Sequence, residues 1–358
     1  MTRKPDGPLR SGWTTGACAT AAACGAFRAL ISGQFPETET IRLPRGELPV
    51  FTLVETLLEG DAARAGVIKD AGDDPDITHG ATILSTVRRG PAGSGITFHA
   101  GEGVGMVTKP GLPIPPGEPA INPKPREIMR TNLSEIADQF GLPHDISVTV
   151  SVPGGAALAK KTWNPRLGIV GGLSILGTTG IVVPFSCSAW IHSIHRGIDV
   201  ARAGGFAHVA GSTGNMSEEA VQKKFDLPLE ALLDMGDFAG GLLKYLRRHP
   251  VPRLTLSGGF AKMLKLAQGN LDLHSSRSQV DFEKLAALVA ECGGTPDLVS
   301  AARNANTAAE VLGLAGDLPL AETVAARARQ TALATLSGDT SVDVLIVDRE
   351  GNELAHVG

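Results

Sequence analysis

The sequence predicts an α+β domain followed by an α/β domain, in which a mostly parallel sheet is joined to its helices by glycine-rich turns. In the first half, strand-like segments alternate apolar and polar residues, which is typical of a sheet with one solvated face. In the second half, strand, glycine turn and helix recur in that order, which is typical of a parallel sheet. Because 358 residues exceed the size at which one hydrophobic core usually stops growing, we expect two domains, over residues 1–160 and 161–358.

The first domain is expected to open with a tightly packed helix over residues 17–30, capped by Thr14 or Thr15. Residues 101–125 are rich in Gly and Pro and predict a long loop, and ordered loops of this length in a compact domain are usually functional. An acidic turn over residues 70–76 lacks the spacing of a calcium-binding loop, so we expect no metal there. Strands are predicted over residues 40–43, 49–58, 81–88, 95–100 and 145–152.

In the second domain, three predicted strands end in glycine-rich turns, over residues 171–180, 211–215 and 257–259. Ligands bind at the carboxyl ends of strands in open α/β sheets, so we expect a nucleoside-bearing cofactor at these turns. The same glycines also fit a purely structural role in tight turns and close packing. The predicted strands cover residues 167–170, 206–210, 253–256 and 342–348. The predicted helices cover residues 188–203, 229–248, 260–268, 280–291 and 318–336.

Composition and charge exclude several classes of function. The net charge of -4, from 33 Lys+Arg and 37 Asp+Glu, gives no basic field for a nucleic acid, and Tyr245 is the single tyrosine. The chain has no run of about 18 apolar residues and no secretory leader, so we expect a cytoplasmic protein without a membrane segment. The four cysteines lie far apart, which argues against a structural zinc site or a disulfide framework.

The chain lacks the motifs of several common enzyme classes. It contains no G-x-G-x-x-G, P-loop or G-x-S-x-G pattern, so dehydrogenase, kinase and triad-hydrolase chemistry lack their signatures. Cys18 and Cys187 lie among small apolar residues and fit packing better than catalysis. His192 and His195 fit one face of a helix, where a metal pair and ordinary packing both stay open. Three acids are available to hold ribose hydroxyls and also fit caps or surface positions: Asp199, Asp234 and Asp237.

Several blocks of distinctive sequence follow one another along the chain. In the first half they cover residues 14–19, 101–105, 108–112, 117–123 and 125–126. In the second half they cover residues 162–172, 174–182, 236–238, 262–267 and 274–275. With these blocks in this order, the chain resembles the cobalt-precorrin-5B C(1)-methyltransferase family, called CbiD, over essentially its whole length. Several long blocks in order are far more specific than one short motif.

The resemblance implies methyl transfer from S-adenosylmethionine to ring carbon 1 of cobalt-precorrin-5B, which gives cobalt-precorrin-6A in anaerobic cobalamin biosynthesis. Cobalt would enter only as part of the substrate, and neither a nucleic acid nor a membrane is implied as a partner. Such a transfer needs alignment and desolvation rather than a protein nucleophile. The alternative function is a non-catalytic corrinoid or tetrapyrrole carrier of the same pathway, and a homo-oligomer stays open.

We hypothesise roles for individual residues on this basis. The cofactor crevice is expected at seven residues of the glycine turns: Gly171, Gly172, Gly177, Thr178, Gly180, Thr213 and Gly214. The carboxylates of a corrin precursor are expected to be held by four residues: Lys109, Asn122, Arg126 and Arg166. Glu118 or His274 is expected to take up or relay a proton. These roles require the Gly/Pro loop of the first domain to face the glycine turns of the second.

Overall fold

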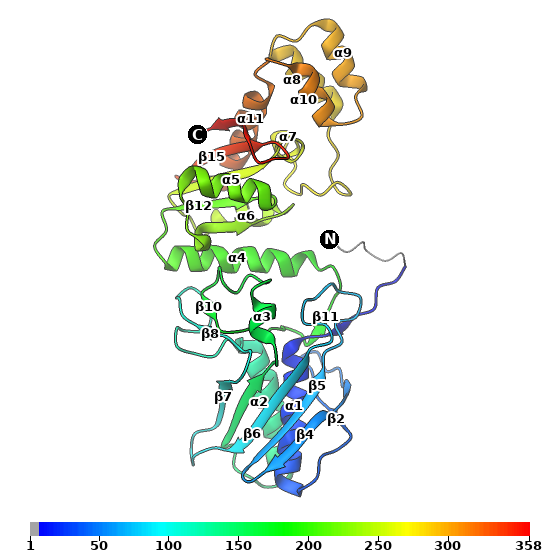
Figure 1. The fold of residues 1–358 in the computed structure, drawn as a ribbon, viewed down its shortest axis with the longest axis vertical. Coiled ribbons are helices and arrows are strands. Elements are labelled where there is room, and N and C mark those ends of the chain that lie inside the picture. The colour runs from blue at the N-terminus through cyan, green and yellow to red at the C-terminus, as the bar shows by residue number, and fades with distance from the viewer. Residues whose placement is uncertain (1–6) are drawn as a thin grey trace. The chain divides into compact units, whose positions relative to one another are not determined.

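The computed structural model describes residues 7–358, and the chain divides into two compact units, Met1–Cys187 and Ser188–Gly358. We call them unit 1 and unit 2, and Figure 1 shows the elements of each. The boundary predicted at residue 160 differs from this division. The reason is that the next segment of the chain pairs with strands of unit 1 and does not join the sheet of unit 2.

Unit 1 is built on a five-stranded sheet in the order β4-β5-β6-β9-β7. Neighbouring strands are antiparallel, except for β7 and β9, which are parallel. The alternating pattern predicted for a sheet with one covered face is seen in β9, where Ile146, Val148 and Val150 are buried. A turn at Gly60 (φ 57°) separates β4 from β5, a strand that was not predicted. The bounds are β4 (Val54–Glu59), β5 (Ala62–Ile68), β6 (Thr82–Arg89), β9 (Ile146–Ser151) and β7 (Ile96–Ala100).

Helices α1 (Thr15–Ser32) and α2 (Pro123–Gln139) pack with this sheet in the core of unit 1. The prediction of an N-cap threonine is confirmed, because the Thr14 hydroxyl accepts a hydrogen bond from the Ala17 N–H at 3.2 Å. Helix α1 is rich in alanine and is buried on nearly all sides, so neighbouring segments can pack closely against it. Helix α2 was not predicted, although Asn122 and Pro123 form a regular helix start.

Three short strand pairs and helix α3 (Gly155–Ala159) complete unit 1. All three pairs are antiparallel: β1 (Gly12–Trp13) with β11 (Ile181–Val182), β2 (Thr38–Thr40) with β3 (Val50–Thr52), and β8 (Met106–Val107) with β10 (Ile169–Val170). The assignment of residues 167–170 to the parallel sheet is therefore wrong. A short apolar run followed by glycines also occurs where two backbones pack closely, and the sequence does not separate the two cases.

Unit 2 contains a second five-stranded sheet, in the order β13-β12-β14-β15-β16. The first four strands are parallel and β16 is antiparallel to β15, so a mostly parallel sheet is present in the second part of the chain. Residues 229–248 were predicted to be helical, but they contain the 3-10 turn η1 (Leu229–Ala231) and strand β13 before a helix begins. The bounds are β13 (Leu232–Asp234), β12 (His208–Ser212), β14 (Arg253–Gly259), β15 (Ser341–Val347) and β16 (Glu353–Val357).

Helices lie on both faces of this sheet. Helix α5 (Asn215–Phe225) covers one face through an apolar cluster that includes Ala210, Val221 and Leu345. Helix α6 (Ala239–Leu246) packs on the other face, where Leu242 lies against Gly211. The remaining helices are α4 (Cys187–Ala203), α7 (Phe260–Ala267), α8 (Phe282–Glu291), α9 (Pro296–Asn304), α10 (Ala308–Ala315) and α11 (Leu320–Leu336). Helices α8, α9 and α10 group together at one end of unit 2 (Figure 1), and neither α9 nor α10 was predicted.

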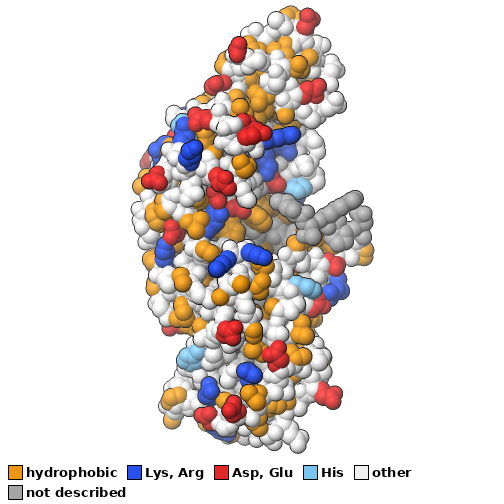
Figure 2. Space-filling view, in the orientation of Figure 1, with side chains coloured by type: hydrophobic (Ala, Val, Ile, Leu, Met, Phe, Trp, Pro, Cys, Tyr) orange, Lys and Arg blue, Asp and Glu red, His pale blue; other side chains and the backbone are white. Residues whose placement is uncertain are grey.

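The surface carries charges of both signs. On the face drawn in Figure 2, Lys and Arg side chains are interspersed with Asp and Glu, and they do not gather into one basic field. Within residues 7–358, no helix is long and apolar enough to cross a bilayer.

Candidate functional site

The parallel sheet of unit 2 has a topological switch point between β12 and β14. From β12 the chain passes through α5 to β13 on one side, and the next strand, β14, lies on the other side of β12. The connections on the two sides diverge at the carboxyl ends of β12 and β14, which is where ligands bind in open α/β sheets. This edge of the sheet is therefore the first candidate for a small-molecule site.

Two helices begin at this edge without a side-chain cap. Helix α5 follows Gly214 and helix α7 follows Gly259, and neither N-cap residue supplies a side-chain hydrogen bond. The first backbone N–H groups of a helix have no partner within the helix and carry partial positive charge. The two predicted cofactor residues of this turn, Thr213 and Gly214, thus lie at an electropositive backbone turn at the switch point.

An open pocket of ≈ 190 Å³ lies beside this turn. It is smaller than the pockets of about 300–1,000 Å³ that enclose most of a drug-sized ligand, so it fits one end of such a molecule. Its lining comes from the start of α5, the N-cap of α7 and the end of β15: Thr213, Gly214, Asn215, Met216, Ser217, Gly259, Val347, Asp348 and Arg349. Gly259 and residues 347–349 were not predicted as site residues. The glycine turn at 257–259 was a signal for Gly259, and the sequence offered no signal for residues 347–349.

Lys262 links two loops at the carboxyl edge of the sheet, and the sequence did not predict it as a site residue. Its Nζ donates to the carbonyl of Thr213 at 3.0 Å and lies 3.1 Å from Oδ1 of Asp237. The carbonyl of Asp237 accepts a hydrogen bond from the N–H of Leu273 at 2.8 Å, which holds the segment that carries His274. His274 itself is exposed, and its Nδ1 lies 2.7 Å from the hydroxyl of Ser276. The proton-relay candidate His274 therefore belongs to the loop at this edge.

The three acids that the sequence makes available for ribose binding have different surroundings. Asp199 accepts a hydrogen bond from the hydroxyl of Tyr245 at 2.8 Å and pairs with Arg196 at 3.0 Å, so its role is structural. Asp237 pairs with Lys262. Asp234 is the last residue of β13, the strand next to β12, and it follows Gly214 by the interval of about 20 residues that separates glycine turn and ribose-binding acid in dinucleotide sites.

In unit 1, the Gly/Pro segment of residues 101–122 lies against the segment of residues 162–180. Backbone hydrogen bonds link them from the N–H of Gly105 to the carbonyl of Leu173 (2.8 Å) and from the N–H of Asn122 to that of Ile175 (3.1 Å). A Cβ on Gly172 would lie 2.3 Å from the backbone of Gly103, so this glycine is required by close packing. The two predicted ligand-binding segments do meet, but within unit 1.

The remaining predicted cofactor glycines also belong to unit 1. A Cβ on Gly177 would lie 2.3 Å from Oγ1 of Thr14, and one on Gly180 would lie 2.4 Å from the side chain of Leu43. Gly171 and Thr178 are exposed, and Gly171 has open space beside it. Their predicted place at a strand-to-helix turn of the parallel sheet is wrong, because the flanking strands β10 and β11 pair antiparallel with β8 and β1.

The predicted substrate residues gather along these two segments. Arg126 lies in the first turn of α2, where its guanidinium donates to the carbonyls of Ile121 (2.8 Å) and Pro119 (3.0 Å). Both of its Nη atoms lie 3.2 Å from Oε2 of Glu118, so the proton-relay candidate of unit 1 is held in an ion pair. Asn122 is the N-cap residue of α2, the Lys109 side chain lies over Gly168, and Arg166 lies over the ring of Trp163.

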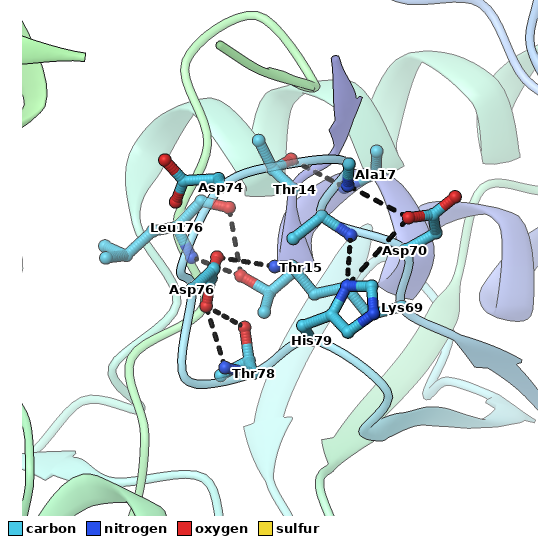
Figure 3. A network of polar contacts seen from close by, with 12 residues as sticks. Thr14, Thr15, Ala17, Lys69, Asp70, Asp74, Asp76, Thr78, His79 and Leu176 are labelled. Atoms are coloured by element: carbon cyan, nitrogen blue, oxygen red, sulfur yellow. Dashed lines mark hydrogen bonds and ion pairs between the residues drawn. The ribbon is translucent and has the colours of Figure 1, made fainter. Parts of the chain in front are cut away.

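The acidic turn of residues 70–76 takes part in a network of polar contacts beside the start of α1 (Figure 3). Lys69 is 1% exposed, and its Nζ lies 2.6 Å from Oδ2 of Asp76, whose other oxygen accepts two hydrogen bonds from Thr78. Hydrogen bonds from Arg10 hold the pKa of Asp70 at about 2. Asp73 and Asp74 accept backbone N–H bonds from Arg10 and Phe185. Within residues 7–358, no group of three or more His, Cys, Asp or Glu side chains is placed to hold a metal ion.

Cys18, Cys24 and the pair of His192 and His195 have surroundings that fit packing rather than catalysis. Burial raises the pKa of Cys18 to about 12 and raises that of Cys24 well above its ordinary value, so both thiols stay protonated. The rings of His192 and His195 meet edge to face at 6.0 Å, and His195 stacks on Tyr245 with centroids 3.9 Å apart. Burial lowers the pKa of His195, which favours its neutral, packed form.

Unit 2 is an open α/β domain with a mostly parallel sheet, and its candidate small-molecule site lies at the carboxyl ends of the parallel strands. Residues 2–184 match the family described as CbiD, and residues 272–358 match the family described as CbiD, C-terminal domain. The chain belongs to the CbiD family.

Its relatives carry a specific name. A protein from Brucella anthropi named cobalt-precorrin-5B C(1)-methyltransferase is 60% identical over 352 residues, which cover 98% of this chain and 96% of that protein. A protein of the same name from Brucella canis is 60% identical with the same coverage. A crystal structure described as cobalamin biosynthesis protein (cbiD) from Archaeoglobus fulgidus is 28% identical, with a TM-score of 0.42, over 76% of this chain and 84% of that one.

Proposed function

We propose that this chain transfers a methyl group from S-adenosylmethionine to carbon 1 of cobalt-precorrin-5B, giving cobalt-precorrin-6A in cobalamin biosynthesis. The observation that carries this proposal is the 60% identity, over 98% of the chain, to proteins named for that reaction. Cobalt is part of the substrate in this reaction, and the protein contributes binding and alignment.

The chemistry agrees with the residues available. The electron pair of the ring carbon forms the new carbon–carbon bond as the bond between sulfur and methyl breaks, and S-adenosylhomocysteine leaves. The sulfonium is already activated, so the protein needs to hold donor and acceptor in line and exclude water. Two buried, protonated thiols and the absence of a triad motif are consistent with a site that acts by positioning.

The donor site is proposed at the switch point of unit 2. There the turn of Thr213 and Gly214 presents backbone N–H groups at the start of α5, and Asp234 ends the neighbouring strand at the spacing of a ribose-binding acid. Close packing accounts for Gly172, Gly177 and Gly180, so these glycines are not proposed to bind the donor directly. Residues 171–180 are proposed only to form a surface together with the Gly/Pro segment.

The acetate and propionate groups of the corrin precursor are proposed to bind the basic side chains of unit 1. Arg126 and Arg130 lie near the ring of Phe98, at 5.8 and 4.9 Å from its centroid, and Lys109 and Arg166 lie on the two packed segments. Arg side chains bind carboxylates through two parallel hydrogen bonds. We propose that Glu118 orients Arg126 and that His274 is the residue available to accept a proton.

Incubation of the purified chain with methyl-labelled S-adenosylmethionine and cobalt-precorrin-5B tests the function, with mass spectrometry to detect one added labelled methyl group. Absence of methylation, together with calorimetric binding of the corrinoid but not of S-adenosylmethionine, would instead indicate a carrier.

The location of the donor site is tested with two glycine variants. Nothing lies within 4 Å of a Cβ built on Gly214 or on Gly313, so the first side-chain atom of a leucine meets no described atom at either position. Gly214→Leu adds a side chain to the lining of the pocket and is expected to raise the Kd for S-adenosylmethionine at least about tenfold, roughly the loss of one good contact. Gly313→Leu, on α10, is the control and should bind as the parent does. Equal affinities for all three proteins, with methylation intact, would place the donor elsewhere.

A further inference from the structure

The pocket beside α5 is built like a small anion site, and this inference rests on the proposed donor site. Arg349 follows β15 and lines the pocket with the start of α5. It is exposed, and no described residue forms a hydrogen bond or ion pair with its guanidinium. The pocket therefore joins a free cationic side chain to the positive end of an 11-residue helix.

The acid in the lining, Asp348, accepts three hydrogen bonds from its own turn. Its Oδ1 accepts hydrogen bonds from the N–H groups of Glu350 (2.9 Å) and Asn352 (2.8 Å), and its Oδ2 accepts one from the Asn352 side chain (2.9 Å). The hydrogen bond from the Asn352 side chain has the largest effect, and together these bonds lower the pKa of Asp348, which keeps the carboxylate ionised. The carboxylate thus serves to shape the turn that presents Arg349.

An independent observation is the hydroxyl of Ser212. The residue is 1% exposed, and its Oγ is buried with no hydrogen-bond partner among the described residues. Ser212 ends β12 and pairs in register with Ser257, whose hydroxyl donates to the carbonyl of Ser217 in the first turn of α5 at 2.9 Å. Side chains paired in register lie on the same face of a sheet, so the Ser212 hydroxyl points toward the first turn of α5. Buried polar groups normally have a partner, and Ser212, which has none among the described residues, directly precedes Thr213 in the lining of the pocket.

The donor offers one group with the matching chemistry. S-adenosylmethionine carries a single carboxylate, at its methionyl end, and a pocket of ≈ 190 Å³ suits that end better than the whole molecule. We propose that this pocket binds the methionyl carboxylate of the donor, with Arg349 and the first N–H groups of α5 as its donors of hydrogen bonds. The nucleoside then extends from the Gly214 turn toward Asp234.

The test compares S-adenosylmethionine with its decarboxylated form, using calorimetry on the full chain. Arg349→Gln is expected to raise the Kd for S-adenosylmethionine about tenfold, as for the loss of a charge-assisted bond, and to leave the Kd for decarboxylated S-adenosylmethionine unchanged. Arg248→Gln, at another exposed arginine of unit 2, is the control and should change neither value.

Three outcomes would overturn the assignment. Arg349→Gln could weaken both ligands equally, or neither, and in both cases Arg349 does not bind the carboxylate. Inorganic phosphate could bind in an Arg349-dependent way without competing with S-adenosylmethionine, which would make this a site for free phosphate. If neither donor form binds the parent protein, the proposed donor site itself fails, and that result is distinct from a failure of the carboxylate subsite alone.

Discussion

Replacing Asp76 by Asn leaves the ammonium group of Lys69 buried without an anion. Lys69 is 1% exposed, Asp76 is 26% exposed, and their charged atoms lie 2.6 Å apart. Removing one partner of a buried ion pair costs about 3–5 kcal/mol, and the partial exposure of Asp76 places the expected loss near the lower limit, about 3 kcal/mol. Urea denaturation followed by tryptophan fluorescence measures this loss, provided that the slope with urea is unchanged.

An ion pair of similar length at the surface shows whether burial, rather than the short distance, causes the expected loss of stability. Lys124 and Glu127 lie 2.7 Å apart, but their side chains are 52% and 60% exposed. Glu127→Gln is therefore expected to cost less than about 1 kcal/mol. The double variant Lys69→Met with Asp76→Asn removes the buried charge and should recover most of the stability lost in the single variant. If Asp76→Asn costs no more than Glu127→Gln, the reasoning that burial makes this pair important is refuted.

Two further predictions concern stability. Gly177→Val is expected to lower the free energy of unfolding by about 3 kcal/mol, because a Cβ there would lie 2.3 Å from the Thr14 hydroxyl and the backbone has a φ of 133°. Urea denaturation would measure the loss, and an unchanged midpoint would contradict the packing argument. Burial favours a raised pKa for Asp343, but hydrogen bonds and charge from Arg253 outweigh it and lower the pKa. The stability from Asp343 is therefore present above its unfolded pKa of about 3.9 and is lost as pH falls through the lower folded value. Asp343→Asn should cost about 2 kcal/mol at pH 7 and less at pH 3, and a cost that does not change with pH would exclude this charge effect.

Local signals predicted much of the fold. The N-cap of α1 and the helices α4, α7, α8 and α11 follow from capping residues and apolar spacing that act within a few residues. The parallel sheet of unit 2 also follows, because strand, turn and helix repeat along the chain. Helix α2 could have been found, since Pro123 fits the first position of a helix and buried Ile128, Met129 and Leu133 follow at helical spacing.

The candidate site was predicted less completely, because its residues are joined by the fold and not by the sequence. The turn of Thr213 and Gly214 carries a local glycine signal, but Arg349 reaches the same pocket from the end of β15. The glycines of residues 171–180 gave an equally strong signal with another cause, namely backbone contacts with distant segments such as that of Gly172 with Gly103. A sequence shows that a glycine is present, but the structure is needed to show which atoms require it.

The alanine-rich helix α1 carries two buried cysteines whose reaction with a thiol reagent would report local unfolding of unit 1. Its thiols, at Cys18 and Cys24, are 0% and 1% exposed, whereas Cys187 and Cys292 are partly accessible. A thiol-alkylating reagent should therefore modify two cysteines readily and reach the other two only when the helix separates from its neighbours. The slow phase of labelling then measures how often that separation occurs in the native protein, without any introduced probe.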